Sequence, residues 1–497
     1  MVRTAFDNPA ALMWFEREPG RPLQWQVYES LRRAILAGRL APGARLPASR
    51  RLAEDLGLGR NTVLAALDQL ASEGYVMART GSGTFVSSEL PDRLPEARGV
   101  DKGAPRRAAG TTRPATSRGE RLAAAAQVRD ARTGAFVPGL ADYLSFPFSR
   151  WSRLMARTWR RPDPRLLTPG DPAGYMPLRE AIADHLRLFR GVDCGPEQVI
   201  ISSGVRQGID LIARVLLSPG DKVWLEEPGY PGLVSAFAAA GADLVPVAVD
   251  RDGLRVDRGR ALAPDARFAC VAPSHQHPLG VTMSLARRLD LLGWAREANA
   301  WLIEDDYDSE YRYRGRPLAA LQGLDRDGRV IYIGSFSKVM FASLRLGYLV
   351  VPTHLADLFR RARTAYDDPP SMIAQVPLAR FMAEGQLAQH IRRTRRLYAE
   401  RQEILLAAAA RHLSDDLVLH REGAGMHLVA RFTRQLAARM DDVEASARAA
   451  AHGIMVSPLS RHYMAHAPEQ GLLLGYAHVE EGAIEPAVRR LATALHK

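Results

Sequence analysis

Hydrophobic positions recur with a helical period near the N-terminus. In QVYESLRRAILAGRL one face collects four apolar residues, Val27, Leu31, Ala34 and Ile35. A second helix is expected in RRLAEDLG, with Ser49 as its N-cap, and a third in RNTVLAALDQLASEG. The next segment, YVMARTGSGTFV, alternates around Gly81 and Gly83 like a β-hairpin. This order predicts a winged helix-turn-helix domain over residues 21–87; the helices alone would also fit a three-helix cap with a solvated arginine face.

The remainder of the chain has a different pattern. Apolar runs such as QVIIS, KVWLEE, RFACVAP, AWLIEDD and RVIYIGS are separated by segments of helical length. This alternation predicts an α/β domain with a mainly parallel sheet over residues 134–497. Residues 88–133 are rich in Pro, Gly, Ala, Thr and Arg and poor in large apolar residues, so we expect a flexible linker there.

Composition narrows the class of protein. The 497 residues carry a net charge of +12 and are 47% hydrophobic, which is ordinary for a globular protein and compatible with a polyanionic partner. We find no apolar run long enough to span a membrane and no signal-peptide pattern, so a cytoplasmic location is expected. The two cysteines, Cys194 and Cys270, lie outside any metal-binding cluster and are interpreted as core residues, and no metal is predicted.

The start of the third predicted helix has the chemistry of a DNA-reading element. Arg60, Asn61 and Thr62 stand where a recognition helix meets the major groove. Arginine binds phosphate or guanine, and short polar side chains contact neighbouring bases. We therefore expect double-stranded DNA as a partner.

Lys338 follows the apolar run VIYIGS and could hold a cofactor covalently. Pyridoxal phosphate needs an amine for attachment, a carboxylate for its ring nitrogen, and cationic and hydroxyl donors for its phosphate. Asp305 and Tyr307 end another apolar run, at the sheet edge where ligands collect. Asp305 is assigned to the pyridinium nitrogen and Tyr307 to the phenolic oxygen. Taken one at a time, these residues could equally be a surface lysine, a helix cap and a turn aromatic.

The phosphate has its own set of candidate residues. Polar and cationic side chains near Lys338 are Ser335, Ser337 and Arg345. The segment SSGVRQGIDL begins a predicted helix, and its backbone N–H groups at Gly204, Val205 and Arg206 favour an anion. The aromatic ring of Tyr230 in EEPGYPG is a candidate to stack on the cofactor.

The N-terminal segment resembles the GntR-type winged helix over its whole length, from PLQWQVYESL to GSGTFV. This resemblance implies a set of DNA contacts from Arg45, Ser49, Arg50, Arg60, Asn61, Thr62, Arg79 and Gly81. The chain has Gly59 where the family often has serine, so the serine's phosphate contact is absent.

The larger segment resembles fold-type I aminotransferases, and the motifs APSHQHPLG and GDPAGYMPLRE resemble the MocR subgroup of GntR regulators. The resemblance implies large and small subdomains, pyridoxal 5'-phosphate as cofactor, and a head-to-tail homodimer in which Tyr175 reaches the partner subunit's phosphate. His277 stands where aminotransferases carry an asparagine that contacts the phenolic oxygen. Ala342 replaces a frequent proline.

The segment GLLLGYA departs from the aminotransferase pattern more seriously. Leu473 stands where the resemblance implies an arginine that binds a substrate carboxylate. Since arginine recognises carboxylates by paired hydrogen bonds, its loss weakens or redirects amino-acid binding. Arg461, His462 and Arg206 are alternative partners for a carboxylate.

These features together predict a DNA-binding transcriptional regulator that depends on pyridoxal phosphate. Its effector is expected to be an amine, an amino acid or the vitamin B6 cofactor itself, and the missing arginine favours a ligand other than an α-amino acid. A symmetric dimer has two winged helix-turn-helix domains, which we call its heads, and these predict two operator half-sites. The rival hypotheses are a working aminotransferase with an accessory DNA-binding domain and a regulator that has lost the cofactor.

Overall fold

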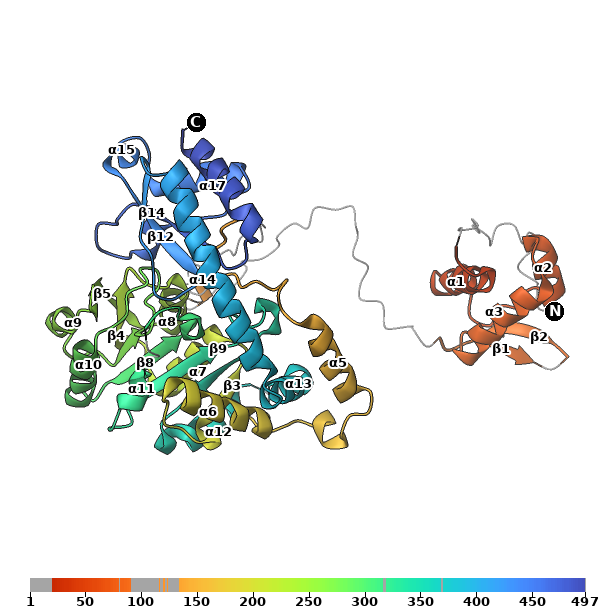
Figure 1. Ribbon diagram of the computed structural model, residues 1–497. Helices are drawn as coiled ribbons and strands as arrows, with labels where there is room; N and C mark the ends of the chain where they lie inside the picture. Colours follow the sequence, from red (N-terminus) through yellow and green to blue (C-terminus); the bar gives the residue numbers. More distant parts are fainter. Residues whose placement is uncertain are drawn as a thin grey trace. The chain divides into compact units, whose positions relative to one another are not determined.

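The computed structural model describes residues 20–79, 81–90, 116, 119–120, 123, 134–315, 319–367 and 370–496. The chain splits into two compact units, Met1–Arg113 and Pro114–Lys497 (Figure 1). The division falls within the segment predicted to be a linker, most of which lies outside the described residues. Among the described helices, none is long and apolar enough to cross a membrane.

The N-terminal unit is a winged helix-turn-helix. Its elements are α1 (Leu23–Leu36), α2 (Ser49–Leu56), α3 (Arg60–Ser72), β1 (Val76–Arg79) and β2 (Gly83–Val86). The four residues predicted for one face of the first helix are all buried, together with Val63 and Leu70 of α3. The strands β1 and β2 pair antiparallel as the predicted wing. The hydrophobic pattern therefore gives the correct fold for this unit.

The cap of the second helix differs from the prediction. Ser49 is the first residue of α2, and Ala48 occupies the N-cap with no side-chain hydrogen bond. The helical conformation begins at Ser49 itself. The cap position is therefore one residue earlier than predicted, at Ala48. At the other end Gly57 adopts a left-handed conformation with φ of 61°, as the tight turn to α3 requires.

The C-terminal unit is built on an eight-stranded sheet. In spatial order its strands are β3 (Val199–Ser202), β10 (Gly347–Val350), β9 (Val330–Ser335), β8 (Trp301–Asp306), β7 (Phe268–Val271), β4 (Lys222–Glu227), β5 (Asp243–Asp250) and β6 (Gly253–Leu254). Only β10 and β6 run antiparallel to their neighbours. The mainly parallel sheet is confirmed, and the five apolar runs form β3, β4, β7, β8 and β9. Both cysteines are buried, as expected.

Helices cover both faces of this sheet. They are α6 (Met176–Arg190), α7 (Val205–Leu216), α8 (Pro231–Ala240), α9 (Val256–Leu262), α10 (Leu285–Glu297), α11 (Leu321–Leu324), α12 (Thr353–Tyr366) and α13 (Met372–Ala383). Neighbouring residues of β10 point to opposite faces of the sheet. Tyr348 packs in one hydrophobic cluster with Ile182 of α6, and Leu349 packs in another with Ile212 of α7. The sheet is therefore buried on both sides, which is typical of parallel architecture.

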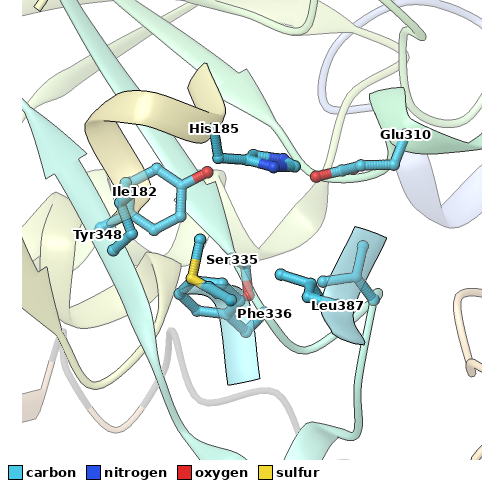
Figure 2. A pocket seen from close by; sticks show the side chains of 9 residues that line it. Ile182, His185, Glu310, Ser335, Phe336, Tyr348 and Leu387 are labelled. Atoms are coloured by element: carbon cyan, nitrogen blue, oxygen red, sulfur yellow. The ribbon is translucent and has the colours of Figure 1, made fainter. Parts of the chain in front are cut away.

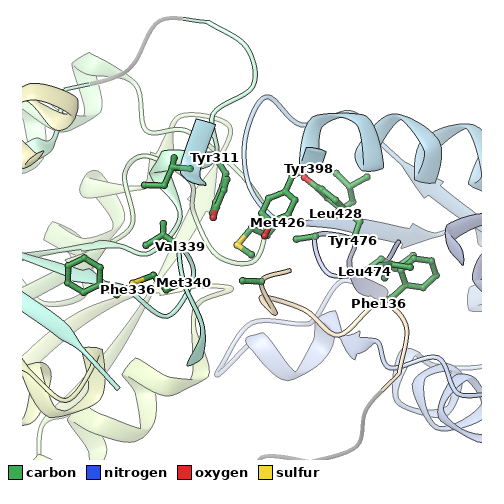
Figure 3. Packing of buried hydrophobic residues seen from close by; sticks show 14 of the residues in the cluster. Phe136, Tyr311, Phe336, Val339, Met340, Tyr398, Met426, Leu428, Leu474 and Tyr476 are labelled. Carbon is green, nitrogen blue, oxygen red and sulfur yellow. The ribbon is translucent and has the colours of Figure 1, made fainter. Parts of the chain in front are cut away.

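A smaller antiparallel sheet completes the unit, in the order β11 (Leu417–Leu419), β12 (His427–Phe432), β14 (Gly471–Gly475) and β13 (Ser457–Pro458). It is accompanied by α14 (Gln386–His412), α15 (Arg434–Ala437), α16 (Asp442–Ala451) and α17 (Glu481–His496), and α5 (Phe148–Trp159) precedes α6. One hydrophobic cluster runs from Phe336 and Met340 of the large subdomain to Met426 and Tyr476 of the small one (Figure 3). The two subdomains therefore share a core.

Candidate cofactor site and nucleic-acid interface

Lys338 lies in the turn that follows β9, and the shared core holds its backbone. The two residues after it, Val339 and Met340, are buried, and the Tyr311 hydroxyl donates to the Lys338 carbonyl oxygen at 3.1 Å. The Lys338 Nζ donates to the carbonyl oxygen of Gly139 at 2.6 Å. A Cβ at position 139 would stand 2.5 Å from this amine and displace it, and the φ of 69° at Gly139 also favours glycine. The amine is therefore held at a defined position.

Three carboxylates are buried where β8 ends. The Asp306 Oδ2 accepts from Arg190 Nε at 2.7 Å, and Asp308 lies 3.1 Å from the His275 Nδ1. These two acids have cationic partners inside the protein. The Oδ1 atom of Asp305 is buried and has no hydrogen-bond partner in the structure.

The electrostatics of Asp305 follow from this arrangement. Desolvation, followed by the negative charges of Asp306 and Asp308, raises its pKa from 3.8 to about 7, against the opposing effect of Lys338. A protonated ring nitrogen placed against Asp305 would supply both the missing hydrogen bond and the missing positive charge. The residues present therefore fit the pyridine end of pyridoxal phosphate.

The predicted phosphate residues meet at the same edge of the sheet. Ser202, Gly347 and Ser335 are register partners across β3, β10 and β9, which brings the ends of these strands together. Gly204, with φ of 109°, precedes α7, whose first residues are Val205 and Arg206. The Arg345 guanidinium lies 3.8 Å from a Cβ built on Gly204. A helix N-terminus and a guanidinium together form a binding site for a phosphate.

The serines and tyrosines assigned to the cofactor surround this edge. The Ser337 backbone N–H donates to the Ser335 Oγ at 3.1 Å. Tyr307 Oη lies 3.0 Å from His275 Nδ1, and the rings of Tyr230 and His277 lie edge to face with centroids 5.5 Å apart. The structure thus brings the candidate ring-binding residues together.

Several residues of this site were not identified from the sequence. Gly139, His275, Asp308 and His427 all lie near Lys338, Tyr307 or His277, and His462, which the sequence suggested only as a partner for a carboxylate, lies beside His277. The motifs SHQH and DYD contain two of them and offered a signal. Gly139 and His427 come from segments far away in the chain, where no local pattern marks them.

The structure separates the candidate partners of a carboxylate. Arg461 is exposed, whereas His462 is buried and lies 5.0 Å from His277 between ring centroids. Arg206 belongs to the first turn of α7, at the phosphate end. Leu473 is buried in β14 among apolar side chains. Tyr175 is half-buried at the start of α6, and its reach to a partner subunit remains a prediction.

A small cavity lies beneath the turn that carries Lys338 (Figure 2). His185, Glu310, Ser335 and Phe336 line it, and its volume of about 10 Å³ leaves room for roughly one water molecule. Burial lowers the pKa of His185 to about 4 and raises that of Glu310 to about 7. The cavity is too small for a cofactor or effector, so we assign the ligand site to the Lys338 amine. The described residues contain no group suited to a metal ion.

The N-terminal unit exposes the residues assigned to DNA. Arg45, Arg50, Arg60, Asn61, Arg79 and Gly81 are exposed, and Ser49 and Thr62 are half-buried. Arg45 pairs with Phe85 as an isolated bridge, and the Arg79 guanidinium lies 5.1 Å from the centre of the Phe85 ring. The wing therefore presents two arginines side by side. A third arginine, Arg60, begins α3.

Comparison with known proteins covers both units. Residues 23–86 match the model of bacterial regulatory proteins of the gntR family, and residues 143–491 match aminotransferase class I and II. A probable rhizopine catabolism regulatory protein, MocR of Rhizobium meliloti, is 44% identical over 97% of this chain and 96% of its own. The chain belongs to the MocR-type subgroup of GntR regulators. The pyridoxine biosynthesis regulator PdxR of Corynebacterium glutamicum is 32% identical over 95% of both chains.

Two solved aminotransferases share the fold of the C-terminal unit, which we call the effector unit. Kynurenine aminotransferase of Pyrococcus horikoshii is 26% identical with a TM-score of 0.66, over 77% of this chain and 95% of its own. LysN, an α-aminoadipate aminotransferase of Thermus thermophilus, is 27% identical with the same TM-score and coverage. The relatives that span both units are regulators, which favours the regulator over the aminotransferase with an accessory domain. The MocR-type chain thus has a fold that implies dependence on pyridoxal phosphate.

Replacing Lys338 tests covalent attachment of the cofactor. The purified protein, supplied with pyridoxal phosphate and dialysed, is expected to absorb near ~420 nm, and Lys338→Ala is expected to lose this band. The reason is that Lys338 supplies the amine that forms the covalent bond. Lys222→Ala, which removes an exposed lysine paired with Asp265, is the control and should keep the band. A band that survives in Lys338→Ala would assign attachment to another residue.

Replacing Asp305 tests whether its carboxyl group has a raised pKa when no cofactor is bound. In cofactor-free protein the folded pKa of about 7 lies above the ordinary value of 3.8, so the folded state holds a proton that the unfolded state loses. Its stability therefore falls as pH rises from about 4 to about 7. Asp305→Asn should remove this fall and be more stable than the wild type at pH 8 by on the order of 2 kcal/mol.

Thermal unfolding at several pH values measures this effect. With pyridoxal phosphate present the order should reverse, because the ring nitrogen stabilises the ionised Asp305. Asp290→Asn, at an exposed position of α10, serves as the control. Equal pH profiles for Asp305→Asn and wild type would show that Asp305 is ionised without a ligand.

Proposed function

We propose that this transcriptional regulator binds pyridoxal phosphate at Lys338 and senses an amine through the effector unit. The observation that carries the proposal is the buried, unpartnered Oδ1 of Asp305 near the positive Lys338, on a chain that also exposes Arg60 at the start of α3. A fold that had lost its cofactor would gain nothing from a buried carboxylate oxygen without a hydrogen-bond donor.

Different residues of the effector unit bind different parts of the cofactor. Asp305 would hold the ring nitrogen, Tyr230 and His277 would contact the ring, and Tyr307 would donate to its phenolic oxygen. The phosphate is held by the start of α7 and by Arg345, with Ser335 and Ser337 supplying hydroxyls. When bound, the cofactor supplies an electrophilic carbon that reacts reversibly with amines. Amine binding at this position changes contacts between the subdomains and thereby the arrangement of the heads.

The relatives suggest two kinds of signal for this site. The Rhizobium relative is a probable regulator of rhizopine catabolism, and the Corynebacterium relative regulates pyridoxine biosynthesis. The chain is closer to the first, with 44% against 32% identity. Because the cofactor reacts with amines, we propose an amine effector, with sensing of the cofactor itself as the second candidate.

A head-to-tail homodimer is supported by an exposed apolar face. Large apolar side chains that are exposed in the C-terminal unit include Tyr143, Leu144, Phe148, Leu167, Met176 and Ile373. The Phe148 ring lies 5.4 Å from Phe341, three residues after Lys338, and Trp159 Nε1 donates to the Ile373 carbonyl oxygen. This face is therefore continuous with the cofactor site, and Tyr175 stands beside it. A second copy of the chain would cover it.

DNA binding by the head is tested with duplexes selected from a random pool by the wild-type protein. Arg60→Ala is expected to weaken binding about tenfold or more, since a guanidinium at the recognition helix contacts phosphate or guanine. Fluorescence anisotropy at several salt concentrations measures both the affinity and the salt slope. Arg33→Ala removes the same charge from an exposed position of α1 and should bind like wild type. An equal loss of DNA affinity in both variants would show that the loss comes from the change in net charge and not from a contact made by Arg60.

The dimer is tested by placing charge on the exposed apolar face. Leu144 and Leu167 are 70% and 66% exposed, so the double variant Leu144→Asp/Leu167→Asp should fold normally and sediment as a monomer. Leu188→Asp, at a position 79% exposed in α6, should remain dimeric. Sedimentation velocity with cofactor-loaded protein makes the comparison. A dimeric double variant would place the interface elsewhere.

A further inference from the structure

Four imidazoles pack near one another in the candidate cofactor site, where the charge of Lys338 acts on His277 and His427, and we call them the imidazole wall. They are His275, His277, His427 and His462. His277 lies at the centre, with ring centroids 5.2 Å from His427 and 5.0 Å from His462, and His275 lies 5.7 Å from His427. The large subdomain supplies the first two rings and the small subdomain the last two. A ligand held by this wall therefore contacts both subdomains.

Backbone contacts fix which nitrogen of two rings carries a proton. His462 Nδ1 lies 3.1 Å from the Gly229 carbonyl oxygen, so Nδ1–H donates there and Nε2 presents a lone pair. This Nε2 is buried and has no partner. His427 Nε2 lies 3.0 Å from the Pro278 carbonyl oxygen, which leaves Nδ1 as its acceptor. Two members of the wall therefore offer acceptors, not donors.

The wall is largely uncharged. Burial, together with the neighbouring histidines and Lys338, lowers the pKa of His277 well below its ordinary value and that of His427 to about 3. Burial also lowers the pKa of His462 to about 4. His275 is the exception, because the Asp308 carboxylate raises its pKa and cancels its charge. The wall thus offers no net positive charge.

The small subdomain places apolar side chains behind the wall, and its Glu422 carboxylate lies beside His275. Leu472, Leu473 and Leu474 of β14 are fully buried, and Leu473 packs with Leu279 and Leu459. Arg461 is exposed, away from these buried side chains. A carboxylate needs a guanidinium or another cation when it is taken out of water, whereas a hydroxyl needs only an acceptor. The wall therefore suits hydroxyl groups better than a carboxylate.

We propose that the effector is a primary amine that carries hydroxyl groups and no carboxylate, with these hydroxyls donating to His427 Nδ1 and His462 Nε2. This inference rests on the proposed function, because it places the amino group of the ligand near Lys338. It goes further by assigning the specificity of the site to the two histidines of the small subdomain. An α-amino acid would bring a negative charge against uncharged acceptors.

The test is calorimetric titration of the full-length, cofactor-loaded protein with a matched pair of ligands. Serinol corresponds to L-serine with the carboxylate replaced by a hydroxymethyl group, so the pair differs in that group alone. Serinol is expected to bind at least about tenfold more tightly than L-serine, and more tightly than isopropylamine, which lacks hydroxyls. L-serine binding as tightly as serinol, isopropylamine binding as tightly as serinol, or no binding of any of the three would each overturn the proposal.

Variants assign the effect to the wall. His462→Leu should weaken serinol binding about tenfold and leave isopropylamine binding unchanged, since only the acceptor is removed. His427→Leu is the second variant, and His420→Leu, at an exposed position of the small subdomain, is the control. Thermal unfolding and the cofactor absorbance verify that each variant folds. Unchanged serinol affinity in the folded variants would contradict the assignment.

Failure of this inference can be separated from failure of the proposed function. DNA binding and cofactor absorbance are measured on the same preparation and do not depend on serinol. If the protein is yellow, binds DNA and prefers L-serine, the proposed function as a regulator stands and the proposal of a hydroxylated amine as effector is wrong.

Discussion

Burying several carboxylates at one edge of the sheet is the constraint on which the effector unit depends. Each buried acid needs a cation or hydrogen-bond donors, because desolvation favours its neutral form. Asp306 is matched by Arg190, and Asp308 by His275. Asp305 keeps an unpartnered oxygen and a raised pKa. Asp305 is thus the buried carboxylate of this edge that a ligand cation would satisfy.

The position of Lys338 depends on packing rather than on charge. Its neighbours Val339 and Met340 belong to the hydrophobic cluster that joins the two subdomains, and Tyr311 binds its carbonyl oxygen. The amine that would hold the cofactor is therefore fixed by the same core that the small subdomain completes. A ligand that changes the contact between the subdomains acts directly on this core, which gives the effector unit a physical route from binding to a change of shape.

The imidazole wall extends this argument to specificity. In a site of this kind a guanidinium would select carboxylates, whereas uncharged imidazoles select donors. Both acceptors assigned here come from the small subdomain, and the amine and the carboxylate Asp305 come from the large one. Recognition of the ligand and contact between the subdomains are therefore parts of one event.

The sequence by itself determined the elements and their chemistry. Periodic apolar residues such as Val27 and Leu31 marked the helices of the head, and continuous apolar runs marked the central strands, because these patterns follow from local geometry. The segments around Lys338, Asp305 and Arg60 were recognisable for the same reason, since each lies within a short contiguous motif. The N-cap at Ser49 was wrong, because caps depend on one residue's backbone conformation.

Only the tertiary structure decided which distant residues meet. Gly139 and His427 meet Lys338 from segments far apart in the chain, and no local pattern marks them. It also decided that Arg461 is exposed while His462 is buried, although the two are adjacent. The physical reason is that contacts across subdomains and burial arise from packing of the whole chain, whereas propensity and motif chemistry are written within a few neighbouring residues.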